Sequence, residues 1–328
     1  MPTTLVVRSE TWPIRGSFRI ARGAKTAAEI VVVEIADERA TGRGECVPYP
    51  RYGETPTQVI ADIDALRSEL AQGLNREALQ RRLKPGAARN ALDCALLDWE
   101  AKASGKSAAD VLGLPPPIPA RTAYTLSLDT PDAMAKAATA AALTYRTIKL
   151  KIAGAGDLER VAAVRRAAPN ARLIADANEG WSVDDLYRLT PELARLGVVL
   201  IEQPLKSADD DTLLDFKSPV PLCADESCHT RADLPRIVGR YSHINIKLDK
   251  TGGLTEAVAL AREATAAGLK LMIGCMVSTS LSIAPAMLLA RFAEFVDLDG
   301  ALLLERDRVP SLAVRGDELL PPTTELWG

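Results

Sequence analysis

From residue 120 to about residue 300 the chain repeats one unit, a short apolar strand followed by a polar turn and an amphipathic helix. A polar residue or a glycine stands near the C-terminal end of each expected strand, at intervals of 22 to 27 residues: Lys151, Asp176, Glu202, Asp225, Lys247, Gly274 and Asp297. One strand plus one crossover helix has about this length, so the spacing predicts the βα units of a parallel (β/α) barrel. The expected strands are Tyr124–Leu128, Thr147–Ile152, Leu173–Asp176, Val198–Glu202, Pro221–Asp225, Ile244–Lys247, Leu271–Gly274 and Phe295–Asp297.

The first part of the chain has a different pattern. It opens with β-rich segments at Leu5–Val7 and Glu29–Ile35 and ends in helical periodicity between Pro85 and Leu112. Four prolines in the six residues 114–119 cannot continue a helix or a central strand. We therefore predict an N-terminal domain of residues 1–118 and a barrel domain of residues 119–300.

Composition and charge exclude several classes of protein. The 40 Lys and Arg residues against 43 Asp and Glu residues give a net charge of −3, and aromatic residues make up only 4%. Neither value suits a nucleic-acid-binding surface, which needs basic patches and stacking side chains. No apolar run reaches the ~18 residues of a membrane helix. Five scattered cysteines and an N-terminus without a secretory pattern predict a cytoplasmic location.

Ionisable residues at the strand ends indicate where the site lies. Barrel enzymes carry their catalytic groups at the C-terminal ends of the strands, whereas the opposite face serves stability. Six ionisable side chains would converge on one rim here, at a cost in free energy unless a metal or a substrate balances their charges. The pattern therefore predicts a charged active site at this rim.

Three of these residues are carboxylates on neighbouring strands: Asp176, Glu202 and Asp225. The chain has only two histidines, so a zinc or iron site has few ligands to draw on. Oxygen ligands suit Mg²⁺, which leaves coordination positions open for water or substrate. We expect Asn178 to orient a ligand and Glu226, next to Asp225, to point to the other face of its strand.

Lysines of two opposite strands are expected to face the same space. Lys149 and Lys151 alternate with aliphatic residues and point inward, as does Lys247, whereas Lys250 is out of phase. Because the second and sixth strands of an eight-stranded ring are opposed, Lys151 and Lys247 would face each other across the metal. A base near neutral pH needs a pKa of ~7–8. We expect the neighbouring Lys149, the metal and partial burial to lower the lysine pKa to that range.

These motifs resemble the enolase superfamily, in the muconate-lactonizing subgroup and most closely the dipeptide epimerases of the L-Ala-D/L-Glu type. The matching segments are Ile148–Lys151, Asp176–Asn178, Ile201–Pro204, Ala224–Ser227, Asn245–Lys247, Gly252–Gly253 and Asn90–Trp99. The resemblance implies an α+β capping domain, completed by residues 301–328, over a (β/α)₇β barrel. It also implies Mg²⁺ on Asp176, Glu202 and Asp225, with Lys151 and Lys247 as the acid/base pair.

The resemblance further implies which residues contact the substrate. Asp297 and Asp299 share a strand face and would hold the α-ammonium group of a dipeptide. The segment Phe18–Lys25, here called the first lid segment, would meet an acidic substrate side chain through its basic residues, Arg22 first. Pro48–Gly53 is the second lid segment. The expected substrate-binding residues are Lys149, Thr125, Arg22, Cys275, Asp297 and Asp299.

The implied reaction is a 1,1-proton transfer at the α-carbon of the C-terminal residue, through an enolate. L-Ala-L-Glu is the first choice of substrate, in the setting of peptidoglycan-peptide recycling. An N-acylamino acid racemase or a cycloisomerase of the same subgroup stays open, although neither substrate class offers a cation to Asp297 and Asp299. A Schiff-base aldolase would leave the three carboxylates unexplained. A catalytically silent barrel that only binds a ligand would leave the two lysines unexplained. Self-association into a homo-oligomer also stays open.

Overall fold

The computed structural model describes residues 4–328, and its main sheet is the predicted eight-stranded parallel barrel. Residues 1–3, on which the expectation of no secretory segment partly depends, lie outside the described part. The strands are β5 (Tyr124–Leu126), β6 (Thr147–Lys151), β7 (Arg172–Asp176), β8 (Val198–Glu202), β9 (Leu222–Ala224), β10 (His243–Ile246), β11 (Lys270–Gly274) and β12 (Phe295–Asp297). Each predicted strand is confirmed to within two residues at either end.

The strand order β5 to β12 follows the chain, so β6 and β10 lie four strands apart, as predicted. Between β12 and β5 the ring closes without a regular ladder. Ala123 N donates to Val296 O (2.8 Å), and Leu298 N donates to the hydroxyl of Thr122 (2.9 Å). Buried aliphatic side chains such as Ile174, Leu200 and Met272 fill the barrel interior. The charged strand ends therefore lie above an apolar barrel interior.

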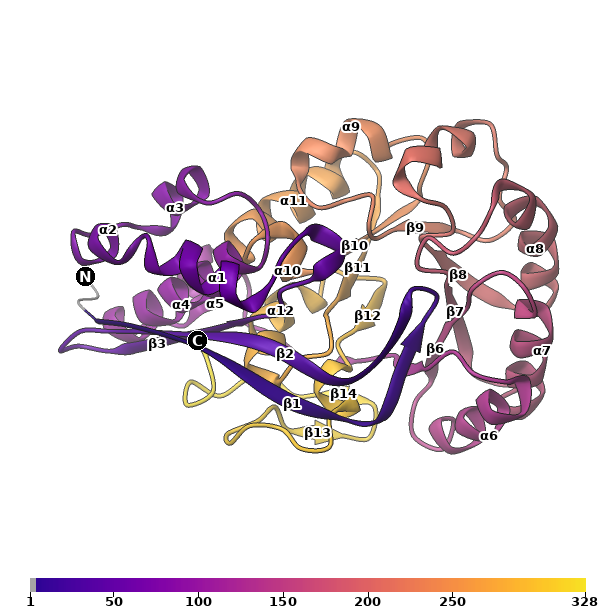
Figure 1. Ribbon diagram of the computed structural model, residues 1–328, viewed down its shortest axis with the longest axis horizontal. Helices are drawn as coiled ribbons and strands as arrows, with labels where there is room; N and C mark the ends of the chain where they lie inside the picture. The colour runs from indigo at the N-terminus through magenta and orange to yellow at the C-terminus, as the bar shows by residue number, and fades with distance from the viewer. Residues whose placement is uncertain (1–3) are drawn as a thin grey trace.

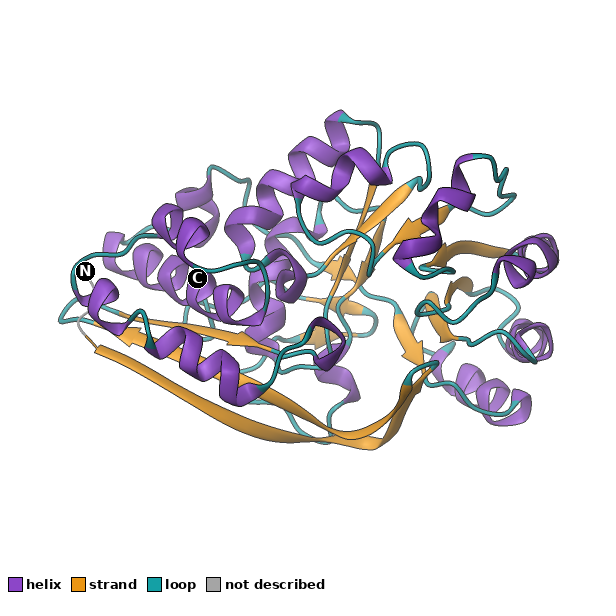
Figure 2. Ribbon diagram, turned by 45° about the horizontal axis from the view of Figure 1, so that its top comes forward, coloured by secondary structure: helices purple, strands orange, loops and turns teal. Residues whose placement is uncertain are grey.

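Helices surround the barrel (Figure 2). They are α6 (Pro131–Ala141), α7 (Asp157–Ala167), α8 (Val183–Arg195), α9 (Leu234–Ile237), α10 (Leu248–Thr251), α11 (Leu254–Ala266) and α12 (Ser280–Ala290). The predicted unit of strand and helix fails after β8, where the chain forms the 3₁₀ segment Ser207–Leu214 instead of an α-helix. That segment holds the acidic run 209–211, which leaves few apolar residues to build an amphipathic face.

The N-terminal region forms an antiparallel sheet of β1 (Thr4–Ile20), β2 (Gly23–Ala36) and β3 (Thr41–Cys46). Its helices are α1 (Pro56–Asp64), α2 (Arg67–Ala71), α3 (Arg76–Arg82), α4 (Ala87–Ser104) and α5 (Ala108–Leu112). The β1–β2 hairpin extends across to the barrel end near β6 and β7 (Figure 1), where Leu128 N donates to Arg19 O (2.9 Å). We call this region the cap.

Helix α4 is buried on nearly all its faces because it packs directly on the sheet of the cap. A Cβ atom at Gly44 of β3 would lie 2.0 Å from the carbonyl oxygen of Ala91, and one at Gly42 would lie 2.2 Å from that of Ala95. Only glycine permits so close an approach of strand and helix. The sequence Gly42-Arg43-Gly44 therefore fixes the position of α4, whose other side meets the barrel.

Helix α4 meets the barrel through polar contacts with α10, the helix that follows Lys247. Asp249 Oδ1 accepts hydrogen bonds from Asn90 Nδ2 (2.8 Å) and from Val47 N (3.0 Å). Arg89 donates to the carbonyl oxygens of Thr251 (2.6 Å) and Gly252 (3.1 Å). Cap and barrel are thus joined directly beside a predicted catalytic lysine.

The C-terminal segment, residues 301–328, contacts both the barrel domain and the cap. β13 (Val314–Arg315) pairs with β14 (Glu318–Leu319), which pairs with β4 (Ala120–Arg121). Trp327 Nε1 donates to Cys94 O of α4 (3.2 Å). The domain boundaries at residues 118 and 300 stay predictions. Among residues 4–328, no helix is long and apolar enough to cross a membrane.

The buried junction at Asp249 gives a prediction about stability and pH. Burial raises the pKa of Asp249 to about 7, so its stabilising contribution is complete below pH ~4 and is lost as the pH rises through about 7. We expect the free energy of unfolding of the protein to fall between these values, relative to Asp249→Asn, by up to about 1.4 kcal/mol per pH unit. Urea unfolding from pH 5 to 8 measures this difference, with exposed Asp215→Asn as the control. Parallel pH profiles for the protein and Asp249→Asn would contradict it.

Candidate active site

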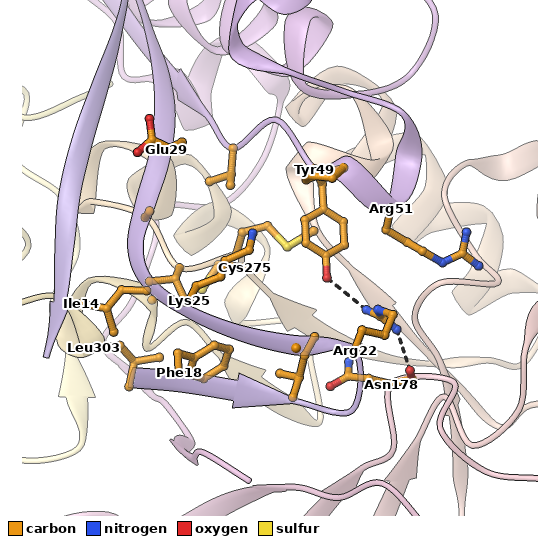
Figure 3. A pocket seen from close by; sticks show the side chains of 18 of the residues that line it. Ile14, Phe18, Arg22, Lys25, Glu29, Tyr49, Arg51, Asn178, Cys275 and Leu303 are labelled. Carbon is orange, nitrogen blue, oxygen red and sulfur yellow. Dashed lines mark hydrogen bonds between the residues drawn. The ribbon is translucent and has the colours of Figure 1, made fainter. Parts of the chain in front are cut away.

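A cavity of about 870 Å³ lies between the cap and the C-terminal ends of the barrel strands. Nine of the eleven predicted site residues line it: Arg22, Thr125, Lys149, Lys151, Asp225, Lys247, Cys275, Asp297 and Asp299. Figure 3 shows its cap side, where Arg22 points toward the hydroxyl of Tyr49. The remaining two, Asp176 and Glu202, do not line the cavity and are fully buried.

Strand register aligns the first row of charged side chains. Lys151 of β6 is paired with Asp176 of β7, and Asp176 is paired with Glu202 of β8. These residues end three neighbouring strands, so their side chains leave the barrel core at the same level. Asp225 follows directly after β9 and continues the row.

Lysine ammonium groups lie among the carboxylates. Lys149 Nζ contacts one oxygen each of Asp176 (3.0 Å), Glu202 (2.6 Å) and Asp297 (2.7 Å). Lys151 Nζ lies 2.6 Å from Asp176 Oδ2 and Lys247 Nζ 2.7 Å from Asp225 Oδ2. Each of these three buried lysines thus has a carboxylate partner, as burial in a low-dielectric interior requires.

Buried carboxylate oxygens held by positive charge mark where a cation fits. Glu202 Oε2 and Asp225 Oδ1 are buried, and they contact the ammonium groups of Lys149 (2.6 Å) and Lys250 (2.8 Å). With the lysines in place, no three acidic, histidine or cysteine side chains of residues 4–328 converge as bound metal ligands do. The donor set nevertheless consists of carboxylate oxygens on adjacent strand ends, which is the chemistry that Mg²⁺ prefers. The three carboxylates therefore fit this ion chemically.

The carboxylates have unequal pKa values. Burial and the repulsion of Asp176 raise the pKa of Glu202 to about 7. Burial also opposes ionisation of Asp176 and Asp225, but the lysines around them outweigh it and lower both pKa values. Asp176 and Asp225 are therefore the firmly ionised members of the set.

Lys247 and Lys250 hold Asp225 from two sides. Lys247 lines the cavity, whereas Lys250 lies behind it, 2.8 Å from Asp225 Oδ1 and bonded to the carbonyl oxygens of Cys228 and Asn245. The choice of Lys247 as the inward residue agrees with this placement. Burial lowers the pKa of Lys247, but Asp225 and Glu202 outweigh it and raise the pKa well above its usual value. The lowering expected from the sequence includes the charge of a bound metal, so it stays a prediction.

Asp297 and Asp299 do not share a strand face, because β12 ends at Asp297. Asp299 lies in the following turn, where its Oδ2 accepts a hydrogen bond from Thr125 N (2.6 Å). Both carboxylates still line the cavity, but Asp297 is paired with Lys149. Burial and the repulsion of Asp297 raise the pKa of Asp299 to about 7. Cys275 lies beside them, with its thiol 3.5 Å from Asp297 O.

Arg22 is bound to the rim of the barrel rather than pointing free into the cavity. It donates to Asn178 O (2.6 Å) and to the hydroxyl of Tyr49 (3.0 Å), as Figure 3 shows, and to Glu226 Oε1 (2.7 Å). Glu226 was expected to face away from the site, which is wrong, since β9 ends at Ala224 and strand alternation stops there. Asn178 contacts Asp176, a predicted metal ligand, through its backbone N–H (3.0 Å), not its side chain.

Several contacts at the cavity and its rim were not predicted. Tyr52 lines the cavity, and Arg51 binds Glu179, which follows Asn178 at the end of β7. Asn245 Nδ2 donates to Glu202 Oε1 (2.8 Å) and orients that carboxylate. The motif around Asn245 was recognised, yet only the fold places its amide against Glu202.

Two family descriptions match the chain. Residues 2–113 match the mandelate racemase / muconate lactonizing enzyme N-terminal domain, and residues 132–322 match an enolase C-terminal domain-like region. The L-Ala-D/L-Glu epimerase of Escherichia coli (strain K12) is 48% identical over 96% of this chain and 99% of that protein. The N-acetyl-D-glutamate racemase of a Pseudoalteromonas species is 45% identical over 91% and 95%.

A solved structure extends the likeness to the whole fold. An enolase family member from Agrobacterium tumefaciens, described as homologous to dipeptide epimerases, with bound sodium and L-Ala-L-Glu, is 50% identical. It superposes with a TM-score of 0.96 over 99% of both chains. Sequence, fold and the row of lysines and carboxylates agree: the chain belongs to the mandelate racemase / muconate lactonizing enzyme family of the enolase superfamily.

Proposed function

We propose that this protein is a Mg²⁺-dependent dipeptide epimerase, an isomerase that inverts the α-carbon of the C-terminal residue of its substrate. The observation that carries the proposal is the position of Lys151 and Lys247, on strands four apart, at the same cavity. Each ammonium group lies against one carboxylate of the set that fits a cation. A substrate α-carbon between them could lose its proton to one lysine, and the planar enolate so formed could gain a proton from the other.

The role of each residue follows from its place. Mg²⁺ held by Asp176, Glu202 and Asp225 would supply positive charge that stabilises an enolate. Lys151 and Lys247 hold and exchange the proton at their Nζ atoms, one on each face of the α-carbon. The proton affinity of Lys247 falls when it leaves Asp225, because that anion raises its pKa. Lys149 keeps a fixed positive charge at the centre of the site.

The cap side of the cavity favours a dipeptide with an acidic C-terminal residue. Asp297 and Asp299 place two carboxylates where an α-ammonium group can bind. Arg22 and Arg51 also line the cavity, where an acidic side chain could bind in exchange for part of their ion pairing with Glu179. The E. coli relative named L-Ala-D/L-Glu epimerase and the structural neighbour with L-Ala-L-Glu support L-Ala-L-Glu as the substrate.

The relative named N-acetyl-D-glutamate racemase supports a second candidate, racemisation of an N-acylated glutamate. Such a substrate has the same α-proton and acidic side chain but no ammonium group. Asp299 favours the dipeptide, because no lysine or arginine of residues 4–328 lies within ion-pair distance of it. An uncharged acyl group would leave that carboxylate without a cation.

The cellular setting completes the proposal. We place the enzyme in the cytoplasm, acting on peptides released from peptidoglycan, with a small molecule as its partner. All five cysteines are unpaired thiols, four of them buried, which supports a reducing compartment. Assembly into a homo-oligomer stays a prediction.

The lysine pair gives the first test of mechanism. We expect Lys151→Met and Lys247→Met each to lower kcat for L-Ala-L-Glu by about 100- to 10,000-fold, with only a few-fold change in KM. Losing a proton-transfer group removes stabilisation of the transition state rather than binding. Polarimetry measures the rates, and exposed Lys270→Met is the control. A kcat within tenfold of the unchanged protein for either variant would contradict the assignment.

Asp299 tests the substrate class. We expect Asp299→Asn to raise KM for L-Ala-L-Glu by about 10- to 100-fold, the loss of one hydrogen-bonded charge pair of ~1.5–3 kcal/mol. Turnover of N-acetyl-L-glutamate should change less than threefold, since that molecule has no ammonium group. Equal losses with both substrates would refute ammonium binding by Asp299, and faster turnover of N-acetyl-L-glutamate by the unchanged protein would favour the second candidate.

A further inference from the structure

Both lid segments of the cap end on one loop of the barrel. This loop, residues 178–180 after β7, is here called the seat. Arg51 of the second lid segment makes two hydrogen bonds to Glu179, from Nε to Oε2 (2.9 Å) and from Nη2 to Oε1 (2.8 Å). Arg22 of the first lid segment donates to the same Oε2 (3.2 Å) and to Asn178 O (2.6 Å). One carboxylate therefore binds arginines from two separate parts of the cap.

The seat is built to receive the first lid segment closely. A Cβ atom at Gly180 would lie 3.0 Å from Ala21 Cβ and 2.8 Å from Ala177 O, so a side chain there would displace the lid segment or its own loop. The side chain of Glu179 is 4% exposed, which leaves its charge dependent on the two arginines. The close packing of the first lid segment and the ion pairs of Glu179 thus lie at the same loop.

The backbone of the seat is strained, and hydrogen bonds to residues at or next to the predicted metal ligands hold it in this conformation. Asn178 and Glu179 have φ values of +45° and +66°, a region that residues other than glycine seldom adopt. Asn178 N donates to Asp176 Oδ1 (3.0 Å), and Glu179 N donates to Gln203 O (2.9 Å), next to Glu202. Backbone strain that the surroundings maintain is characteristic of functional sites.

We propose that Glu179 is a positioning residue that clamps both lid segments over the substrate and holds Arg22 at the cavity rim, where it can meet the substrate's acidic side chain. It contacts no reacting atom, so it acts through Arg22 and Arg51. Because its loop continues the strand that carries Asp176, lid closure and the predicted metal ligand share one rigid segment. The substrate role rests on the proposed function, whereas the clamping of the lid does not.

A double-mutant cycle tests the clamp. We expect Glu179→Gln and Arg51→Met each to raise KM for L-Ala-L-Glu by about 10- to 100-fold while kcat changes less than fivefold. The double variant should be no worse than Glu179→Gln alone, because both changes break the same contact. Exposed Glu159→Gln is the matched control and should leave both constants unchanged. Arg51 is 43% exposed, so Arg51→Met should fold even if Glu179→Gln does not.

Limited trypsin digestion measures how accessible the first lid segment is, independently of catalytic turnover. We expect cleavage after Arg22 and Lys25, located by mass spectrometry, to be at least fivefold faster in Glu179→Gln and Arg51→Met than in the unchanged protein, in the absence of substrate. Equal cleavage rates, or KM effects that multiply in the double variant, would overturn the clamp. Faster cleavage in a protein that does not epimerise any dipeptide would keep the clamp and refute the proposed function.

Discussion

Buried lysine–carboxylate pairing at one end of the barrel is the interaction on which the rest of the structure depends. Lys149, Lys151, Lys247 and Lys250 lie among carboxylates that are almost completely excluded from water. Charges buried in this way are tolerated only when each has a partner of opposite sign. Parallel strands in register supply the partners, since they bring residues about 25 positions apart to one level. The barrel thus allows the chain to bury these lysines and carboxylates together, because it places each beside a partner of opposite charge.

The same pairing explains why a cap is needed. A rim of ionised groups open to water would be solvated and screened, and Lys247 would keep an ordinary pKa. The cap covers this rim with the two lid segments, and Asp249 and Arg89 anchor it beside Lys247. Gly42 and Gly44 let α4 lie close enough to the cap sheet to reach those anchors. The glycines of one strand thereby help to define a cavity far from them in the sequence.

Much of this arrangement could be predicted from the sequence, because barrel geometry turns regular spacing into position. The strands, the inward lysines and the row of carboxylates all follow from alternation and from one polar residue per strand end. Predictions failed where the strands had already ended: Glu226 faces the cavity and Asp299 lies in a turn, so alternation no longer applied to either. Glu179 and Arg51 could not be paired from sequence, since contacts between distant loops leave no local pattern. The raised pKa of Lys247 depends on three-dimensional distances to Asp225 and Glu202, which spacing does not give.

The central claim is that Lys151 and Lys247 exchange a proton with one α-carbon beside a bound cation. Proton NMR of L-Ala-L-Glu in D₂O tests it most directly, with the protein and Mg²⁺ and then with EDTA in excess. The account predicts loss of the glutamate α-proton signal alone, with L-Ala-D-Glu appearing and both changes stopping in EDTA. An unchanged glutamate α-proton in the presence of Mg²⁺, with this dipeptide and across a dipeptide library, would contradict it.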